Sequence, residues 1–459
     1  MAKYQKYAEY KESGVEWLGE IPSHWTVTSL KRYTRITDGS HHSPKIESEG
    51  FPFVSVTDVG INNINFVDAK KITENDYSRL VKEGCKPAVN DVLLTKDGTI
   101  GRACIVTVEM PNFVILSSLG LITPNKEISS QFLYHYLVSG INVDQMNSVI
   151  HGSALKRMTI NKINDLIFTF PDFHEQVKIA DFLEHETAKI DALIAKQEKL
   201  IELLKEKRQA VISHAVTKGL NPNVPMKDSG VEWLGEVPEH WKIKGNKYLL
   251  DFITSGSRGW AQYYADTGAL FFRIANLTRD TIEPKLESLQ FVEQPQGSEG
   301  ERSKIKIGDL LISITADLGS VCVANSSIQN GYVSQHVALC RPQKICEPRW
   351  LAYYILSDTA KEQLLGSGYG GTKIQLSLED IRELVIAVPP KKEQMQIANY
   401  IDEKLSQFEY LIKQADKLVG ILKERRTALI SAAVTGKIDV RDWQSPNKNN
   451  NQNNMELSA

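Results

Sequence analysis

Two stretches of the chain place apolar residues alternately four and three positions apart, the pattern of a helix with a single apolar seam. They cover residues 174–219 and 392–436. At 1.5 Å per residue, a helix of about 40 residues would be roughly 60 Å long and could not bury its seam alone. The pattern therefore predicts that the two helices form an antiparallel coiled coil, a spacer between two other parts of the protein.

The seam of the second stretch is apolar throughout, whereas the first stretch has two polar seam positions, Thr187 and Gln197. A polar residue on a seam weakens the packing but can fix the register of the helix pair. The apolar seam residues are Leu183, Ile190, Ile194, Ile201 and Leu204 in the first stretch and Ile401, Leu405, Phe408, Ile412, Ala415, Val419 and Leu422 in the second.

The helical stretches belong to a repeat that covers almost the whole chain. SGVEWLGEIPSHW at 13–25 returns as SGVEWLGEVPEHW at 229–241, and NDVLLTKDGTIGRACIV from Asn90 corresponds to GDLLISITADLGSVCVA from Gly308. A period of about 218 residues is far too long for a solenoid and indicates a duplicated unit. The expected fold is α+β, with two α/β domains related by pseudo-two-fold symmetry and separated by the two long helices.

The stretches between the repeated segments differ in sequence but have the same order of turn and strand signals. Residues 36–66 and 253–283 both contain Gly and polar clusters followed by β-rich runs, FPFVSV and LFFRIA, so we expect one scaffold with different loops. The predicted boundaries are a leading segment 1–25 that packs with the helical region, a first domain 26–173, a helix 174–219, a repeated leading segment 220–241, a second domain 242–391, a helix 392–436 and an Asn-rich polar tail 437–459, expected to be disordered.

Composition is that of an ordinary soluble globular protein, with 42% hydrophobic and 24% charged residues. The sequence has no run of 18 or more apolar residues, so no membrane span is expected. The polar N-terminus lacks the apolar core of a signal peptide. An odd number of cysteines without a C-x-x-C pair indicates a reducing cytoplasm and no zinc site. The net charge of −2 means that any DNA-binding charge must be gathered on particular surfaces.

Motifs of catalysis and cofactor binding are missing or poorly placed. There is no phosphate-binding G-x-x-x-x-G-K-[ST] loop and no N-P-P-[FYW] tetrapeptide that would hold an adenine for methylation. The glycines at 366–371 do not join a clear strand to a helix. Asp280, Glu283 and Lys285 resemble a nuclease triad, but Pro284 indicates a turn. We therefore expect no catalytic residue in this chain.

Loops at equivalent places in the two halves contain residues of the kinds that contact nucleic acid. Arg, Lys, Asn, Ser and Thr are the side chains that hold phosphates or bond to base edges. The adjacent pair His41 and His42 has no other metal ligand nearby, so loop hydrogen bonding is favoured over a metal site. The candidate DNA-binding residues are Ser40, His41, His42, Lys45, Thr57, Lys96, Thr99, Lys156 and Arg157 in the first half and Ser257, Arg258, Trp260, Arg273, Asn276, Ser320, Tyr369 and Lys373 in the second.

Four tryptophans of the repeated leading segments, Trp17, Trp25, Trp233 and Trp241, fall outside this set. The same motif recurs in both halves although the loops differ, so we expect these four side chains to be packing anchors.

Both halves of the chain, apart from the tail, resemble the specificity (S) subunits of type I restriction–modification enzymes. The resemblance is carried by the leading motif and its repeat, by the P-x-x-x-E-Q runs at 171–176 and 389–394, and by the helix ends LLKEKRQAVISHAVTKG and ILKERRTALISAAVTGK. Each motif alone is weak, but their duplicated order is highly specific. One departure is Phe170-Pro171-Asp172, where the second half has the more usual Val388-Pro389-Pro390.

The resemblance implies that each variable region is a target recognition domain for one half of an asymmetric, bipartite sequence in double-stranded DNA. It also implies that the long helices set the gap between the half-sites and dock two methylation (M) subunits. A helix pair of ~60 Å spans nearly two turns of B-DNA, at roughly 34 Å per turn.

In this family, cofactors belong to the partners. The methylation subunits bind S-adenosylmethionine and methylate adenine N6 after flipping the base from the stack, and restriction (R) subunits use ATP and Mg. The S subunit itself is non-catalytic and holds no cofactor or metal. Alternatives are a free-standing enzyme that modifies or cuts DNA, a coiled-coil scaffold that joins two protein-binding domains, and an S subunit without active partners.

Overall fold

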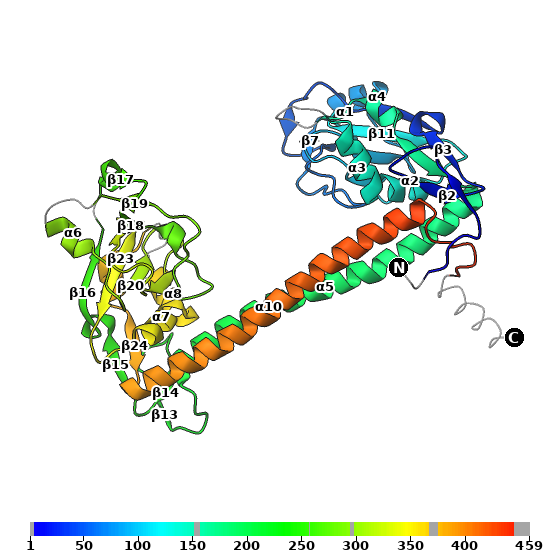
Figure 1. Ribbon diagram of the computed structural model, residues 1–459. Coiled ribbons are helices and arrows are strands. Elements are labelled where there is room, and N and C mark those ends of the chain that lie inside the picture. The colour runs from blue at the N-terminus through cyan, green and yellow to red at the C-terminus, as the bar shows by residue number, and fades with distance from the viewer. Residues whose placement is uncertain (1–3, 151–156, 257, 294–297, 367–374, 445–459) are drawn as a thin grey trace. The chain divides into compact units, whose positions relative to one another are not determined.

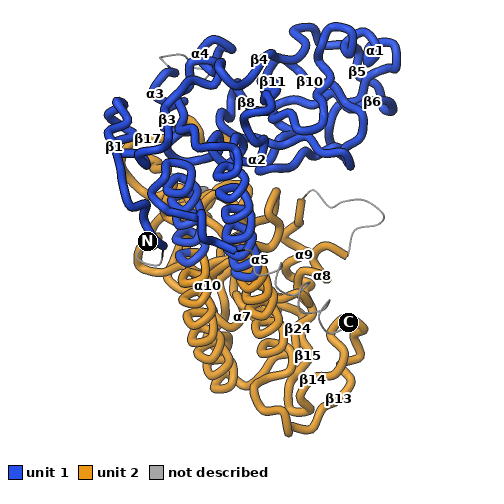
Figure 2. The backbone as a smooth tube through the Cα atoms, turned by 90° about the vertical axis from the view of Figure 1, so that its right-hand side faces the viewer, with its two compact units in different colours: residues 1–197, 417–459 blue, residues 198–416 orange. Residues whose placement is uncertain are grey.

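The computed structural model describes residues 4–150, 157–256, 258–293, 298–366 and 375–444. The chain forms two compact units, one of residues 1–197 with 417–459 and one of residues 198–416 (Figure 2). Both unit boundaries fall inside long helices. Each unit therefore contains one α/β domain together with a part of both helices.

The long helices are α5 (Phe173–Lys218) and α10 (Lys391–Val434) (Figure 1). The duplicated α+β fold with a long antiparallel helix pair is confirmed. In the first unit Leu183 and Ile190 of α5 share a buried cluster with Leu422 of α10. In the second unit Val216 and Ile401 do the same. The polar seam residue Thr187 is buried, and its hydroxyl donates to the carbonyl oxygen of Leu183 at 2.7 Å.

Glycines end both helices in a left-handed backbone conformation, with φ of 76° at Gly219 and 70° at Gly436. After α10 the amide of Gly436 donates to the carbonyl oxygen of Ala433, and that of Lys437 donates to Ala432. These two bonds satisfy carbonyl groups that the helix end would leave unpaired. The repeated T-K-G and T-G-K sequences are thus helix stop signals.

The domain of the first unit contains two four-stranded sheets and two small antiparallel ribbons, with the strand orders β4-β11-β8-β9, β10-β6-β7-β5, β12-β3 and β1-β2. The main sheet is β4 (Thr34–Asp38), β11 (Leu119–Pro124), β8 (Val92–Thr95) and β9 (Ala103–Ile105). The second sheet is β10 (Val114–Ile115), β6 (Phe51–Val54), β7 (Lys70–Ile72) and β5 (Ile46–Glu47). The ribbons are β12 (Ile167–Phe170) with β3 (Thr26–Ser29) and β1 (Tyr10–Glu12) with β2 (Glu20–Pro22). The helices are η1 (Leu30–Arg32), α1 (Glu74–Lys82), α2 (Ser130–Leu137), α3 (Gly140–Ser148) and α4 (Ile160–Asn164).

The second unit repeats this order, with sheets β16-β23-β20-β21 and β17-β19-β18-β22 and ribbons β15-β24 and β13-β14. The main sheet is β16 (Leu250–Ser255), β23 (Val337–Pro342), β20 (Leu310–Ser313) and β21 (Val321–Val323). The second sheet is β17 (Tyr264–Ala265), β19 (Phe291–Val292), β18 (Ala269–Phe272) and β22 (Tyr332–Val333). The ribbons are β15 (Lys242–Gly245) with β24 (Val385–Val388) and β13 (Met226–Asp228) with β14 (Glu236–Pro238). The helices are η2 (Asn246–Tyr248), η3 (Trp260–Tyr263), η4 (Ile274–Asn276), α6 (Ser298–Ser303), α7 (Pro348–Leu356), α8 (Asp358–Gly366) and α9 (Leu378–Arg382).

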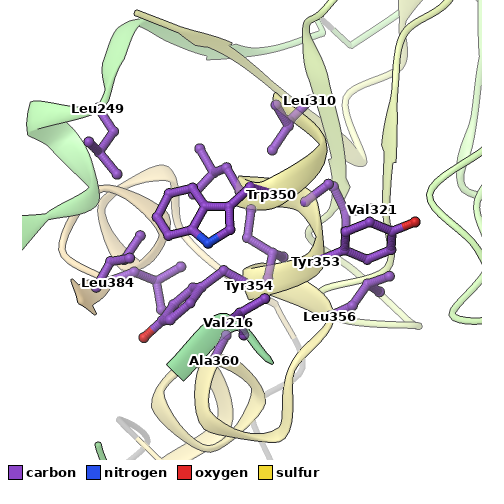
Figure 3. Close-up of a cluster of buried hydrophobic side chains, with 14 of the residues drawn as sticks. Val216, Leu249, Leu310, Val321, Trp350, Tyr353, Tyr354, Leu356, Ala360 and Leu384 are labelled. Atoms are coloured by element: carbon purple, nitrogen blue, oxygen red, sulfur yellow. The ribbon is translucent and has the colours of Figure 1, made fainter. Parts of the chain in front are cut away.

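A helix buried on nearly every side connects each main sheet to the long helices. In the second unit this helix is α7, and its Trp350 and Tyr354 pack in one cluster with Val216 of α5 (Figure 3). The Tyr354 hydroxyl donates to the carbonyl oxygen of Val385 at 2.7 Å, as Tyr136 of α2 donates to Ile167 at 2.9 Å in the first unit. The long helices are therefore part of each domain core.

The repeated tryptophans differ in burial. Trp25 and Trp241 are fully buried, as expected of packing anchors. Trp17 and Trp233, however, are 43% and 48% exposed, so the expectation that they are also anchors is wrong. They occupy turns between the strands of the β1-β2 and β13-β14 ribbons, where nearly half of each side chain is exposed.

The polar tail begins later than expected. Ile438 and Val440 are buried in the core of the first unit, and the ring of Trp443 packs edge-on against Phe182 at 5.7 Å. These apolar side chains pack residues 437–444 against the core of the first unit, including α5. The remaining tail, residues 445–459, lies outside the described residues.

Candidate nucleic-acid interface

The turn after β8 contains a buried lysine, Lys96, whose side chain is only 2% exposed. Its Nζ lies 3.7 Å from Oδ2 of Asp38, the last residue of β4, and 3.9 Å from Oδ1 of Asp97. Lys, Asp and Glu are almost never fully buried unless they are paired. The two carboxylates provide this pairing.

Two exposed side chains extend this set of contacts. His41 Nε2 lies 3.1 Å from Asp38 Oδ2, and Arg157 Nε lies 3.2 Å from Asp97 Oδ1. We call His41, Asp38, Lys96, Asp97 and Arg157 the ionisable row. The structure thus brings together three candidates that are far apart in the sequence.

Backbone contacts fix the loops that carry the row. The amide of Lys96 donates to Ser118, and the amide of Met158 donates to the carbonyl oxygen of Lys96 at 2.8 Å. Before His41, a Cβ on Gly39 would lie 2.1 Å from the carbonyl oxygen of Ile115. Only glycine allows the loop to pass this close to β10.

The other first-half candidates lie on neighbouring loops. Ser40 is buried, and its hydroxyl donates to the carbonyl oxygen of His42 at 2.8 Å, which supports the loop. His42, Thr57 and Thr99 are exposed. Lys45 is exposed and forms a 2.8 Å ion pair with Glu47. Lys156 lies outside the described residues.

The second half has the same turn after β20 without a lysine. Ile314 takes the place of Lys96 and is 4% exposed. Its amide donates to His336, and the amide of Leu376 donates to its carbonyl oxygen at 2.8 Å. Thr315 forms an isolated antiparallel β-bridge with Gln375, as Asp97 does with Arg157. The backbone of the turn is therefore independent of the charges.

Arg258 is exposed in the loop after β16, whereas Trp260 is buried and its ring stacks on Phe271 at 5.6 Å. Asn276 is fully buried, and its amide nitrogen donates to the carbonyl oxygens of Lys285 and Ser288 at 2.9 Å each. These contacts favour structural roles for Trp260 and Asn276. Arg273 is half-buried, with Nη2 3.4 Å from the Ser288 hydroxyl.

Ser320 is buried and its hydroxyl donates to Asp317, which also pairs with Arg279 at 2.6 Å. Burial alone would raise the pKa of Asp317, but the hydrogen bonds from Arg279 and Ser320 outweigh it and lower the pKa. Sequence reasoning missed Arg279, because its contact is with a turn 38 positions away. Ser257, Tyr369 and Lys373 lie outside the described residues.

A cavity of about 620 Å³ opens in the first unit between the domain and the long helices. His135 of α2 lines it, is buried, and has an Nδ1 atom without a hydrogen-bond partner. Burial, and then the positive charge of Arg426, lowers the pKa of His135 to about 3. The side chain is therefore a neutral imidazole at physiological pH.

Within the described residues there is no cluster of three or more His, Cys, Asp or Glu side chains that could hold a metal ion. The five cysteines are free and buried, and burial raises the pKa of the Cys104 thiol to about 11. No helix in the described part of the chain is long and apolar enough to cross a membrane.

The long helices also carry large apolar side chains that face solvent. These residues are Leu193, Leu418 and Ile421 in the first unit and Leu200, Leu203, Tyr410 and Leu411 in the second. We call them the outer apolar residues. Leu193, Leu200, Leu411 and Leu418 each directly precede a seam residue, so the apolar surface of each helix extends beyond the buried seam.

Residues 41–203 and 245–417 match the model of one protein family, the type I restriction modification DNA specificity domain. The chain belongs to this family. Each matched region begins in a variable domain and ends on a long helix. The two specificity domains therefore coincide with the duplicated halves of the fold.

Known specificity subunits are similar to nearly the whole chain. The type I restriction enzyme EcoBI specificity subunit of Escherichia coli is 21% identical over 453 residues, which are 96% of this chain and 91% of that protein. The putative type I restriction enzyme MjaX specificity subunit of Methanocaldococcus jannaschii is 23% identical over 455 residues, 96% of this chain and 99% of that protein. In a solved structure that concerns complex assembly and conformational transition of the type I R-M system, one chain has the same fold, with a TM-score of 0.68 and 17% identity over 90% of this chain and 98% of that chain.

Proposed function

We propose that this chain is the DNA sequence-recognition subunit of a type I restriction–modification complex. The observation that carries the proposal is the presence of two specificity domains, at 41–203 and 245–417, in one chain. Each domain recognises one half of a bipartite target. Because the loops differ between the halves, with Lys96 and Ile314 at the same place, the target is asymmetric.

Exposed cationic and polar side chains near the loop turns are the proposed DNA contacts. In the first half they include His41, Lys45 and Arg157, and in the second half Arg258, with the half-buried Arg273 nearby. Arg and Lys donate to phosphate oxygens and to the O6 and N7 acceptors of guanine. The net charge of −2 is compatible with this role if partner subunits supply further phosphate contacts.

The long helices set the gap between the half-sites and dock two methylation subunits. The outer apolar residues support this role, because exposed apolar patches mark protein–protein contact surfaces. Their presence in both units fits a partner that binds twice. The complex acts in the cytoplasm, and restriction subunits join it to cut unmodified DNA.

The chemistry belongs to the partners: S-adenosylmethionine is bound by the methylation subunits, and ATP and Mg are used by the restriction subunits. This chain is non-catalytic. Its part is to bring the methylation subunits to adenines within the target, where the base is flipped out of the stack.

A genome-wide map of N6-methyladenine in the native host, with and without this gene, tests the proposal. We expect a split motif with a fixed gap that loses methylation in the deletion strain. If no methylation depends on the gene, DNA binding by the chain co-expressed with neighbouring methyltransferase subunits distinguishes the alternatives. DNA retention would indicate a specificity subunit without active partners, and its absence a coiled-coil scaffold.

A further inference from the structure

Burial of Lys96 is a thermodynamic cost that the fold does not require. Removing an ammonium group from water is unfavourable, and its attraction to nearby carboxylates often only offsets that desolvation. Well-packed apolar residues in the place of a buried ion pair are often as stable or more stable. A buried Lys with two Asp partners therefore contributes little to stability, so the presence of Lys96 in this turn needs another explanation.

The second half of the same chain provides an internal control. Asp38 pairs with Gly120 across the main sheet, and at the equivalent place Ser255 pairs with Ala338. Ile314 replaces Lys96 with the same backbone hydrogen bonds. At the antiparallel β-bridge beside this turn, Thr315 and Gln375 stand where the first half has Asp97 and Arg157. The scaffold thus builds this turn with four neutral residues, so the charges serve something specific to the first half.

Lys96 lies between the two acidic residues of the ionisable row. Asp38 and Asp97 come from different segments, and each has a carboxylate oxygen within 4 Å of the Lys96 ammonium group, at 3.7 Å and 3.9 Å. Without this positive charge the two carboxylates would repel each other. The same oxygens lie 3.1 Å from His41 and 3.2 Å from Arg157, two side chains that are 61% and 56% exposed. The buried ammonium group thus lies between two carboxylates that each contact a solvent-facing group on a separate loop.

We propose that Lys96 is a positioning residue for target recognition by the first specificity domain. It does not contact DNA. It orients Asp38 and Asp97, and through them His41 and Arg157, so that these two side chains meet the first half-site with a set spacing. Recognition groups discriminate best when a supporting shell holds them in place. This inference rests on the proposed function and assigns the device to one half-site only.

Two variants test the role of Lys96. Lys96→Met removes the charge at nearly constant shape. The fourfold variant Asp38→Ser, Lys96→Ile, Asp97→Thr and Arg157→Gln installs the neutral residues of the second half, so it leaves no buried charge unpaired. Lys31→Met is the matched control, because Lys31 forms an exposed 2.8 Å ion pair with Asp165 away from the turn.

The full chain and each variant are expressed with the methylation subunits in the host, and N6-methyladenine is mapped across the genome. For Lys96→Met we expect methylation at sites with one wrong base in the first half-site to rise about tenfold relative to the correct site, the equivalent of one lost contact. The fourfold variant, which also lacks the Arg157 contact, should lose at least as much discrimination there. Discrimination in the second half-site stays unchanged. Lys31→Met recognises both half-sites like the natural chain.

Unchanged discrimination in both variants would overturn the inference. An equal loss in both half-sites, or a fourfold variant that no longer folds or no longer binds its partners, would show that the row serves the fold and would overturn it as well. If the natural chain itself gives no gene-dependent split motif, the proposed function fails, and the inference fails with it. A split motif with unaltered variants would leave the proposed function standing.

Discussion

The indole Nε1 of Trp25 donates a 3.1 Å hydrogen bond to Oε2 of Glu175. Trp241 donates to Glu393 at 3.2 Å in the second unit. The tryptophan ends the leading motif, and the glutamate belongs to the P-x-x-x-E-Q run that opens each long helix. One bond thus connects the two repeated motifs, which explains why they recur together although the loops between them differ.

The Glu175 carboxylate should contribute more to stability than that of Glu393. It is nearly fully buried and also accepts from the hydroxyl of Tyr7 at 2.7 Å and lies 2.9 Å from His24 Nε2, whereas Glu393 is less buried and has His240 as its second partner. Each buried donor left without an acceptor costs about 1–3 kcal/mol. We expect Glu175→Ala to lower the free energy of unfolding of the first unit by about 3 kcal/mol, and Glu393→Ala to lower that of the second by about 1 kcal/mol.

Hydrogen–deuterium exchange measured peptide by peptide distinguishes the two units in the full chain. Glu175→Ala should accelerate exchange in the first unit, and Glu393→Ala, its matched control, should have a smaller effect in the second. Equal effects of the two substitutions would argue against the importance of the Tyr7 contact.

The first unit should lose stability in mild acid because of His135. Burial and the charge of Arg426 lower its pKa from 6.5 to about 3. A depressed folded-state pKa means that the unfolded chain binds the proton first, so stability is complete above about pH 6.5 and falls as the pH drops toward 3. Between pH 7 and pH 5 the free energy of unfolding should fall by about 2 kcal/mol from this group.

The second half has Tyr353 at the equivalent place on α7, so His135→Tyr is the natural comparison. Chemical denaturation of both proteins at several pH values tests the linkage. The natural chain should lose stability relative to the variant as the pH falls from 7 to 5. Parallel pH profiles would mean that His135 has the same pKa in the folded and unfolded states, and would contradict the prediction.

Arg258 should matter for the second half-site alone. It is exposed in the loop after β16, at the end of the main sheet of the second unit. We expect Arg258→Ala to reduce methylation at correct sites by about tenfold, since a good Arg–guanine pair is worth about 1–3 kcal/mol. The methylome of an Arg382→Ala strain, which changes an exposed arginine on α9, serves as the control. Altered preference in the first half-site would contradict the assignment.

The helices and the duplication could be predicted from the sequence because both are periodic. Spacings of four and three from Ile401 to Leu422 specify one face of a helix, and the Gly residues after each repeat specify its end. The start of the tail could not be predicted. Ile438 and Val440 are too few for a periodic pattern, and their burial depends on a surface of the first unit formed by distant segments.

The candidate site was harder to predict because burial there depends on contacts across the sheet. Lys96 follows a strand and has the composition of a surface turn, yet Asp38, far away in the sequence, makes its burial possible. Asn276 has the side chain of a base contact, but its amide is bonded to the backbone of its own loop. Residue type alone could not separate exposed Arg258 from buried Trp260 in one loop.

The outer apolar residues should be needed for assembly but not for folding of this chain. Leu418 and Ile421 of α10 are exposed, whereas Leu422 beside them is buried in the core of the first unit. A charge at an exposed position changes the free energy of unfolding by less than about 0.5 kcal/mol. In a protein interface the same charge would be buried without a partner and would cost several kcal/mol.

We therefore expect Leu418→Glu with Ile421→Glu to reduce recovery of the methylation subunit with the tagged chain by more than about tenfold, while denaturation curves of the isolated chain stay the same. Lys417→Glu adds negative charge at a neighbouring polar position and should leave recovery unchanged. If both variants retain the methylation subunit at natural levels, this face of α10 is not its docking surface. If the double variant also lowers the stability of the isolated chain, the two side chains support the fold, and the exposed stripe has no assembly role.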